Sequence, residues 1–454
     1  MNSSFFGDML QTIAERGRAL IAGRPRRAAG EARTATLIER CEELLSIRGE
    51  ASGTALAREI LLDFQELKFG ERVAFFEALA RVFGPDRDRL SRACTAYTDD
   101  PTEAAAAEVL DAAEPRRQEL VRRLNLAPNA TGTLVSMREQ LLDALPLRRD
   151  LSPVDRDFAH LLSSWFNRGF LVLRRIDWSS PANVLEKIIR YEAVHEIRDW
   201  EDLRARIDSP DRRCYAFFHP AMTDEPLIFV EVALTREIPD AIGPVLVSGR
   251  TPLDPREATT ATFYSISNTQ RGLTGVTFGS FLLKQVVEEI SRELPSLTTF
   301  VTLSPVPGFM DWLKEERARP DSTAVQESDV AALAYLDERG WESDAAKVAA
   351  LKPVLSALAA YYFLAARTKR GRPVDPVARF HLGNGARLER INLMADLSEK
   401  ALAQSAGIMV NYQYVVADIE KNHEAYAEAG EVVASSAVKR ALRSERTRTL
   451  VTQS

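Results

Sequence analysis

Thr262–Phe309 reads TFYSISNTQRGLTGVTFGSFLLKQVVEEISRELPSLTTFVTLSPVPGF, and this stretch determines the fold. It opens with Thr262–Ser267, whose β-branched and aromatic residues are typical of a strand. The polar turn Asn268–Gly275 follows with two glycines. Small and apolar residues in Val276–Leu294 then recur at the spacing of an amphipathic helix. Leu297–Leu303 is a second predicted strand, which a Ser-Pro-Val-Pro-Gly turn ends.

The turn between the first strand and the helix suits an anion. Free N–H groups and the helix dipole point toward such a turn, so a phosphate can bind there. The turn is not a Walker A loop, because no Gly-Lys-Ser/Thr follows. It is not a dinucleotide fingerprint either, because Gly272, Gly275 and Gly279 do not fit G-x-G-x-x-G. Spacing alone leaves open a phosphate-binding turn and a strand–turn–helix unit that binds nothing.

Composition places the chain among soluble proteins with a large core. The 454 residues predict two or three domains, and 45% of them are hydrophobic and 27% charged. The formal net charge of −6 argues against wholesale nucleic-acid binding. Cys41, Cys94 and Cys214 are too far apart for a metal site or a disulfide framework, which indicates a reducing compartment. We identify no apolar run of transmembrane length and expect no membrane partner.

The N-terminal segment Phe5–Arg27 is amphipathic and rich in arginine, as mitochondrial presequences are. Asp8 and Glu15 interrupt its positive face, which favours a surface helix followed by a basic linker. We therefore expect a cytoplasmic protein of bacterial type in preference to one of the mitochondrial matrix.

Residues 1–190 are predicted to form an all-helical domain for scaffolding and oligomer contacts. Helical periodicity dominates, and glycines and prolines mark the breaks. The predicted helices are Ala35–Ile47, Ala55–Leu67, Arg72–Phe83, Glu103–Ala113, Pro115–Leu124, Leu134–Ala144 and Phe158–Asn167.

Residues 191–454 are predicted to form an α+β domain with a mixed sheet, because strands alternate with helices and hairpins are also implied. A helical insert, Asp311–Arg367, either covers a site as a lid or packs beside it. The remaining elements are a helix over Val194–Ile207, a terminal helix over Ala425–Leu442, and strands at Cys214–Phe218, Leu227–Leu234, Ile242–Ser248, Val377–Leu382, Leu388–Asn392 and Ile408–Tyr412.

Two residues are candidates for acid–base chemistry. His381 stands at the end of the predicted strand Val377–Leu382, and two glycines follow, so a ligand can approach closely. The alternative is a structural histidine. Ser304 ends a strand, and Pro305 restricts it to extended backbone geometry, which positions its hydroxyl in advance. The alternative is a turn or helix-capping serine.

Other polar side chains carry weaker signals. Tyr412 and Tyr414 lie on one face of a predicted strand, where core packing is the default and a role in a site the alternative. His195 and His423 stand in polar, helix-like surroundings that predict surface positions.

Several longer motifs stand over roughly Tyr191–Tyr414. They are YEAVH (Tyr191–His195), RRCYAFFH (Arg212–His219), FYSISNTQRGLTGV (Phe263–Val276), LSPVPGF (Leu303–Phe309), DPVARFHLGNGA (Asp375–Ala386), RINLMADLS (Arg390–Ser398) and GIMVNYQY (Gly407–Tyr414). In sequence and in order these motifs resemble the malonyl-CoA decarboxylase family.

The resemblance implies a helical N-terminal domain that forms a homo-oligomer, either a dimer or a tetramer. It implies a C-terminal domain with the GNAT-type N-acetyltransferase fold, whose splayed central strands hold coenzyme A. The catalytic pair of the family falls on Ser304 and His381, and its supporting tyrosine falls on Tyr414. The turn that would cradle the pyrophosphate departs from the usual Q/R-x-x-G-x-G/A, because its two glycines are three residues apart. It consists of Gln270, Arg271, Gly272, Leu273, Thr274 and Gly275.

The implied reaction is decarboxylation of malonyl-CoA to acetyl-CoA and CO2, which controls malonyl-CoA in fatty acid metabolism. The thioester is the electron sink, so no metal or organic cofactor is expected. His381 would grip the carboxylate and then protonate the carbanion, and Ser304 would bind the carboxylate or orient the imidazole. Which of the two gives the final proton stays open.

Two other functions remain as alternatives. A CoA-dependent acyltransferase on the same fold would need an acceptor groove, and the sequence shows no distinct acceptor motif. A non-catalytic CoA-binding scaffold would function without Ser304 and His381.

Overall fold

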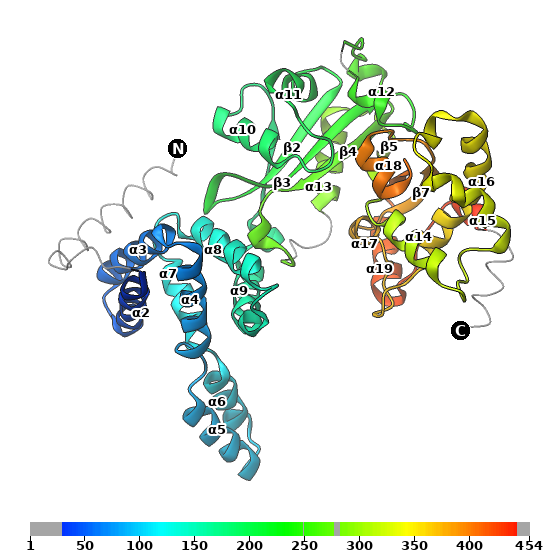
Figure 1. The fold of residues 1–454 in the computed structure, drawn as a ribbon. Helices are drawn as coiled ribbons and strands as arrows, with labels where there is room; N and C mark the ends of the chain where they lie inside the picture. The colour runs from blue at the N-terminus through cyan, green and yellow to red at the C-terminus, as the bar shows by residue number, and fades with distance from the viewer. Residues whose placement is uncertain (1–29, 248, 277–281, 443–454) are drawn as a thin grey trace. The chain divides into compact units, whose positions relative to one another are not determined.

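The computed structural model describes residues 30–247, 249–276 and 282–442, so the predicted surface helix within Phe5–Arg27 lies outside the described residues. The chain divides into two compact units (Figure 1). Of the described residues, the helical unit comprises 30–171, 219–223 and 270–276. The sheet unit comprises the described residues of 172–218, 224–269 and 282–442.

This division differs from the expected boundary at residue 190. Val172–Ile176 forms strand β1, which pairs with β2, and Ala182–Tyr191 forms helix α10, which packs on the sheet. Both elements therefore belong to the sheet unit. The turn at residues 270–275 groups with the helical unit, although we placed it in the second domain.

The helical unit packs around a shared aromatic core, as the periodicity predicts. The rings of Phe64, Phe75 and Phe76 lie 5.3–6.2 Å apart and are fully buried. The predictions missed one helix, α5, whose few buried residues leave a weak apolar pattern. The helices are α2 (Gly30–Ser46), α3 (Glu50–Glu66), α4 (Phe69–Arg81), α5 (Arg87–Asp99), α6 (Glu103–Ala113), α7 (Arg116–Leu124), α8 (Ala130–Ala144) and α9 (Ser152–Trp165).

The sheet unit contains one mixed sheet, so the α+β prediction is confirmed. The strand order is β1-β2-β3-β4-β5-β8-β6, and β7 also pairs with β8. The strands are β1 (Val172–Ile176), β2 (Arg212–His219), β3 (Met222–Thr235), β4 (Thr260–Asn268), β5 (Thr299–Thr302), β6 (Ser304–Pro305), β7 (Arg387–Asn392) and β8 (Met409–Gln413).

Strands β4 and β5 part in the middle of this sheet. They run parallel and pair only where Thr260–Phe263 lies beside Thr299–Thr302. The rest of β4 continues to Asn268 without β5. This is the splayed pair that the resemblance to acetyltransferases implied.

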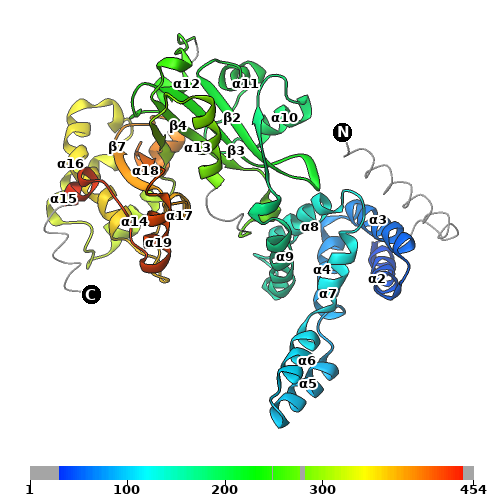
Figure 2. The same ribbon diagram turned by 180° about the vertical axis from the view of Figure 1, so that it is seen from behind.

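Helices cover both faces of the sheet. Helices α10 and α11 (Trp200–Ile207) pack against Cys214 and Ala216 of β2 (Figure 1). Side chains alternate along a strand, so Tyr215 points to the other face. There its hydroxyl donates to Glu293 at the end of α13 (Leu282–Glu293), which Figure 2 shows lying over the sheet.

The helical insert is confirmed and carries its own aromatic cluster. It contains α14 (Phe309–Ala318), α15 (Glu327–Leu333) and α16 (Ala345–Leu364). Phe309 and Trp312 pack on Tyr362 with ring centroids 5.5 and 5.0 Å away. Contrary to our prediction, α16 is long and apolar enough to cross a membrane by composition, and 56% of its apolar window is buried in the protein.

Three predictions in this unit were wrong. Ile242–Ser248 is not a strand, because Gly243–Leu246 forms the short helix α12. Val377–Leu382 lies in helix α17 (Pro376–Gly383), which Asp375 caps by accepting from the Ala378 N–H at 2.7 Å. The terminal helix is broken at Gly430, with α19 (Ile419–Ala429) before the break and α20 (Ser436–Ala441) after it. Helix α18 (Glu399–Ser405) lies between α17 and α19.

Candidate active site

Strand β6 positions Ser304 where β4 and β5 separate. Ser304 pairs with Val410 of β8, and Pro305 continues the extended backbone. The N–H of Leu303 donates to Phe263 O at 2.9 Å, which ties this segment to β4. The rigid backbone geometry that the sequence predicted for Ser304 is therefore supplied by strand pairing as well as by proline.

Helix α17 delivers His381 from its last turn. The chain then reverses through Gly385, which has φ +80°. A Cβ at Gly385 would lie 2.1 Å from the carbonyl oxygen of Ile419. Only glycine fits this left-handed position and close approach. Gly385 thus serves packing, and the histidine sits on a helix and not at a strand end.

Ser304, His381 and Tyr414 form one hydrogen-bonded chain. The His381 Nδ1 lies 2.8 Å from the Tyr414 hydroxyl, and its Nε2 lies 3.1 Å from Ser304 Oγ. Ser304 Oγ lies 2.8 Å from Thr302 Oγ1, which also accepts the Tyr412 N–H at 3.1 Å. The structure thus brings together all three catalytic candidates. Their catalytic role stays a prediction.

Hydrogen counting assigns a direction to this chain. Among the described residues, the Tyr414 hydroxyl bonds only to His381 Nδ1, so its hydrogen points there. Nδ1 is then an acceptor, and Nε2 carries the imidazole hydrogen. Nε2–H donates to Ser304, and the Ser304 hydroxyl donates to Thr302. The reverse direction would leave the buried phenol without an acceptor for its hydrogen.

Burial keeps every member of the chain neutral. Ser304, His381 and Tyr414 are 5%, 2% and 1% exposed. Burial lowers the pKa of His381 to about 3 and raises the pKa of Tyr414 well above its usual range. At neutral pH the site therefore holds an imidazole with a proton on Nε2, not an imidazolium.

Tyr412 fixes the plane of the imidazole. Its ring stacks on His381 with centroids 4.5 Å apart and an interplanar angle of 24°. Phe380 meets the same imidazole edge-on at 5.1 Å. These contacts leave the His381 ring little freedom to rotate.

The helical insert contacts the segments that carry His381 and Ser304. The Tyr362 hydroxyl on α16 donates to Asp375, the cap of α17, at 3.3 Å. The same hydroxyl would lie 3.0 Å from a Cβ at Gly308, in the turn after Ser304. Burial raises the pKa of Asp375 to about 6. These contacts show that the insert packs beside the candidate residues.

Sequence reasoning missed Thr302. Its hydroxyl accepts from both Ser304 and the Tyr412 N–H, so it orients the serine. A usable signal was present, because Thr302 and Ser304 are two residues apart near a predicted strand end and residues so spaced share a face. His195 was also misjudged, since it is partly buried and burial lowers its pKa to about 4.

The predicted pyrophosphate turn packs within the helical unit. Arg271 pairs with Asp143 and, at 3.6 Å, with Glu139 of α8. The carbonyl of Gly272 accepts from Arg138 at 2.7 Å. A Cβ at Gly272 would lie 2.0 Å from the carbonyl oxygen of Val135, so this glycine is required for contact with α8.

Hydrogen bonds inside the turn narrow the possible phosphate donors. The N–H groups of Leu273 and Thr274 donate to the carbonyls of Gln270 and Arg271. Gly275 has φ +78°, and a Cβ there would meet no described atom within 4 Å. Among the described residues, nothing crowds the backbone at Gly275.

Comparison with known proteins points to a single family. Family models described as "Malonyl-CoA decarboxylase C-terminal domain" and "Malonyl-CoA decarboxylase N-terminal domain" match residues 169–452 and 83–166. The mitochondrial malonyl-CoA decarboxylases of Anser anser anser and Mus musculus are each 36% identical to this chain. The matches cover 84% and 81% of this chain and 82% and 81% of those proteins.

Solved structures agree with the sequence comparisons. The crystal structure of malonyl-CoA decarboxylase from Rhodopseudomonas palustris is 58% identical, with a TM-score of 0.87, and the match covers 90% of this chain and 99% of that one. The enzyme from Agrobacterium vitis is 55% identical, with a TM-score of 0.86, covering 90% and 100%.

The hydrogen-bond direction predicts the tautomer of His381. In ¹⁵N-labelled protein we expect the His381 signals to report a proton on Nε2 and to stay unchanged from pH 8 down to 5.5, because the pKa lies near 3. His381→Gln identifies the signals by their loss, and the other histidines serve as internal controls. A proton on Nδ1, or a titration midpoint near 6.5, would contradict the assignment.

Proposed function

Because this chain belongs to the malonyl-CoA decarboxylase family, we propose that Ser304, His381 and Tyr414 form the part of its active site that acts on the malonyl group. The chain is a carboxy-lyase that converts malonyl-CoA to acetyl-CoA and CO2. The observation that carries the residue assignment is the buried hydrogen-bond chain from Tyr414 through His381 and Ser304 to Thr302.

The reaction requires one proton and a sink for one electron pair. The bond between the α-carbon and the carboxylate breaks, CO2 leaves, and the electron pair enters the thioester as an enolate. A proton must then reach the α-carbon to give acetyl-CoA. We assign His381 Nε2–H as the source of this proton, because the neutral imidazole carries it beside Ser304. General acid catalysis of this kind is worth about 10²–10⁴-fold in rate.

In the enzyme without substrate, the Nε2 proton of His381 is hydrogen-bonded to Ser304. Its oxygen accepts from Nε2–H, and its own hydrogen is held by Thr302. When substrate binds, rotation of the hydroxyl away from Thr302 would let Ser304 donate to the carboxylate. Proton loss from His381 leaves an anionic ring, which the hydrogen bond from Tyr414 stabilises until a proton from solvent restores the neutral imidazole.

A bulge in β4 supplies candidate donors for the enolate oxygen. Glu231 pairs with Ser265 and Val232 with Phe263, so Tyr264 is an extra residue in β4. Bulges turn backbone N–H groups out of the ladder. The ring of Phe263 lies 6.4 Å from that of Tyr414, so the bulge adjoins the candidate residues. One such N–H aimed at the enolate would contribute about 3–4 kcal/mol.

We also propose that Gln270–Gly275 binds the pyrophosphate of CoA, with Gly275 at the point of contact. The left-handed backbone and the open space at Gly275 support this role. The Arg271 side chain pairs with Glu139 of α8, so backbone N–H groups of the turn are the better candidates for donors.

We also propose that the protein is a homo-oligomer and that it is cytoplasmic. Exposed apolar side chains on the helical unit, including Leu62, Phe69 and Leu110, support a homo-oligomer formed through that unit. A cytoplasmic location is supported by the bacterial sources of the 55–58% identical structures, against 36% for the mitochondrial relatives. We expect no metal or organic cofactor, because the thioester accepts the electron pair.

Substitution of His381 or Ser304 should slow turnover without weakening the binding of CoA. With malonyl-CoA as the sole substrate, mass spectrometry should show acetyl-CoA from the wild type. His381→Ala and Ser304→Ala should lower kcat at least tenfold, with CoA affinity nearly unchanged. Ser405→Ala is the matched control, since Ser405 is a buried serine on α18. A His381→Ala enzyme with more than about a tenth of wild-type kcat would exclude the acid role.

A carboxylate in the turn should repel the pyrophosphate. Gly275→Glu is expected to weaken CoA binding at least tenfold by calorimetry. Gly275→Ala separates the effects, because it introduces the same left-handed strain without charge. Equal CoA affinity in Gly275→Glu and Gly275→Ala would contradict the proposal that this turn binds the pyrophosphate.

A further inference from the structure

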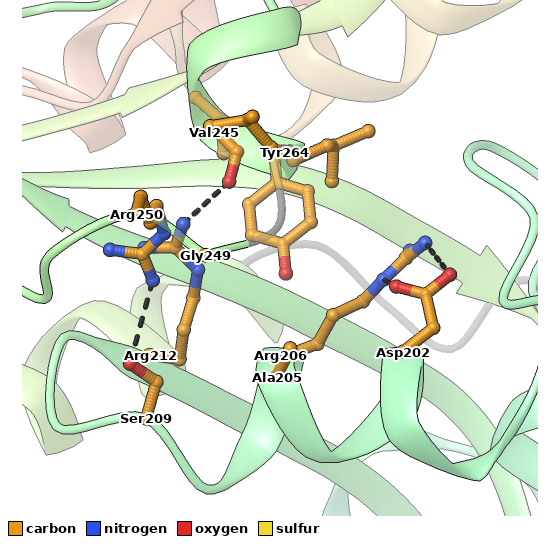
Figure 3. A pocket seen from close by; sticks show the side chains of 11 residues that line it. Asp202, Ala205, Arg206, Ser209, Arg212, Val245, Gly249, Arg250 and Tyr264 are labelled. Carbon is orange, nitrogen blue, oxygen red and sulfur yellow. Dashed lines mark hydrogen bonds and ion pairs between the residues drawn. The ribbon is translucent and has the colours of Figure 1, made fainter.

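A pocket of about 100 Å³ opens in the sheet unit beside α11, away from the candidate catalytic residues. Its charged lining consists of Arg206, Arg212 and Arg250, with Asp202 as the one carboxylate, and Tyr264 completes it (Figure 3). The volume suits an ion of a few heavy atoms. Because guanidinium groups outnumber carboxylates in the lining, the pocket favours a negatively charged occupant.

Arg212 is a buried cation whose ion pair, with Asp211, is long and shared with Arg250. It is 4% exposed, and its guanidinium donates to the carbonyls of Asp211 at 3.1 Å and Val245 at 2.6 Å. Among the described residues its nearest carboxylate oxygen, on Asp211, is 3.7 Å away. Burial, and then Arg250, lower the pKa of Arg212. A buried charge of this kind is stabilised by a counter-ion.

Arg206 and Arg250 differ from Arg212 in this respect. Arg206 bonds to both oxygens of Asp202 at 3.2 Å, and Arg250 pairs with both oxygens of Asp211. Asp211 also accepts from the Leu253 N–H at 3.0 Å. The carboxylates near the pocket thus bond most closely to Arg206 and Arg250, and Arg212 keeps only the longer contact with Asp211.

Tyr264 contributes a buried hydroxyl, which lies near enough to Glu231 to lower the pKa of that carboxyl. The residue is 1% exposed, and its hydroxyl has no hydrogen-bond partner among the described residues. Figure 3 shows the hydroxyl pointing between the side chains of Arg212 and Arg206. A buried hydroxyl without a partner is costly, and an anion in the pocket would satisfy it.

Glu231 lies 3.5 Å from Arg206 and offsets little of the positive charge at neutral pH. Burial, and then the neighbouring Glu192, raise the pKa of Glu231 to about 8, so this side chain is largely protonated at neutral pH. Its Oε1 also lacks a hydrogen-bond partner among the described residues. The competing arrangement is a direct Tyr264–Glu231 hydrogen bond, which would leave the pocket without ligand.

We propose that this pocket is a second ligand site, which binds the phosphate or carboxylate group of a small anion between the Arg212 guanidinium and the Tyr264 hydroxyl. The site is separate from the catalytic candidates, because Tyr264 turns its ring toward α11 and α12 whereas Phe263 faces Tyr414. Tyr264 is the extra residue of the β4 bulge. An occupant therefore holds the bulge from the side opposite the candidate active site.

Calorimetry of the full chain with inorganic phosphate tests the site. Saturating CoA is present throughout to fill any phosphate site that serves the substrate, and chloride keeps the ionic strength constant. The wild type should bind one phosphate per chain. Titration with acetate under the same conditions shows whether a carboxylate is an equal or better occupant.

Tyr264→Phe should weaken phosphate binding about tenfold, because it removes one hydrogen bond to a charged group and preserves the ring. Tyr215→Phe is the matched control, since Tyr215 is a buried strand tyrosine whose hydroxyl points to the opposite face. It should bind like the wild type. Arg250→Gln, at the half-buried rim, is a second variant that should also weaken binding.

Two outcomes would overturn the proposal. One is absence of phosphate and acetate binding by the wild type above the chloride control, which would favour the direct Tyr264–Glu231 hydrogen bond. The other is equal binding by the wild type and Tyr264→Phe. Decarboxylase activity is not needed for either readout, so failure here is separable from failure of the catalytic assignment.

Discussion

The hydrogen bond between His381 Nε2 and Ser304 Oγ is the interaction on which the site depends. It joins a helix to a short strand at a place where both side chains are buried. Burial makes the imidazole neutral, and a neutral imidazole needs one donor and one acceptor. Tyr414 is the donor and Ser304 the acceptor, so the proton is left on the nitrogen that faces the serine. A solvent-exposed pair would not have this fixed direction.

The surrounding structure positions the two residues of this hydrogen bond. Asp375 starts the helix that carries His381, and Gly385 lets the chain turn back immediately after it. Tyr362 reaches from the helical insert to the cap of that helix and to the turn that follows Ser304. The insert is therefore a support for both halves of the pair. Its apolar helix α16 is explained by burial in this position.

Sequence predicted the parts of the site that depend on local patterns. Strands β4 and β5 were found because their β-branched residues are flanked by turns, and Ser304 because Pro305 restricts its backbone. Helix α17 was missed because VARFHL has apolar residues at alternating positions, as a strand does. A segment this short does not distinguish the period of a strand from that of a helix. Asp375-Pro376, a capping residue followed by proline, was the better indication that a helix begins there. Local patterns do not contain tertiary packing. They therefore could not predict the separation of β4 and β5, the hydrogen bonds of Thr302, or the contacts between Gly272 and α8.

The role of Thr302 gives the most direct test of the central claim, that a directed hydrogen-bond chain prepares His381 as the acid. Thr302→Val keeps the shape of the side chain and removes the oxygen that holds the Ser304 hydroxyl. It should lower kcat for malonyl-CoA about tenfold with KM unchanged, and Thr302→Ser should restore kcat. Thr262→Val, a matched change at a buried threonine of β4 that bonds to Thr235, should leave kcat unchanged. Full activity in Thr302→Val, or an equal loss in Thr262→Val, would contradict the account.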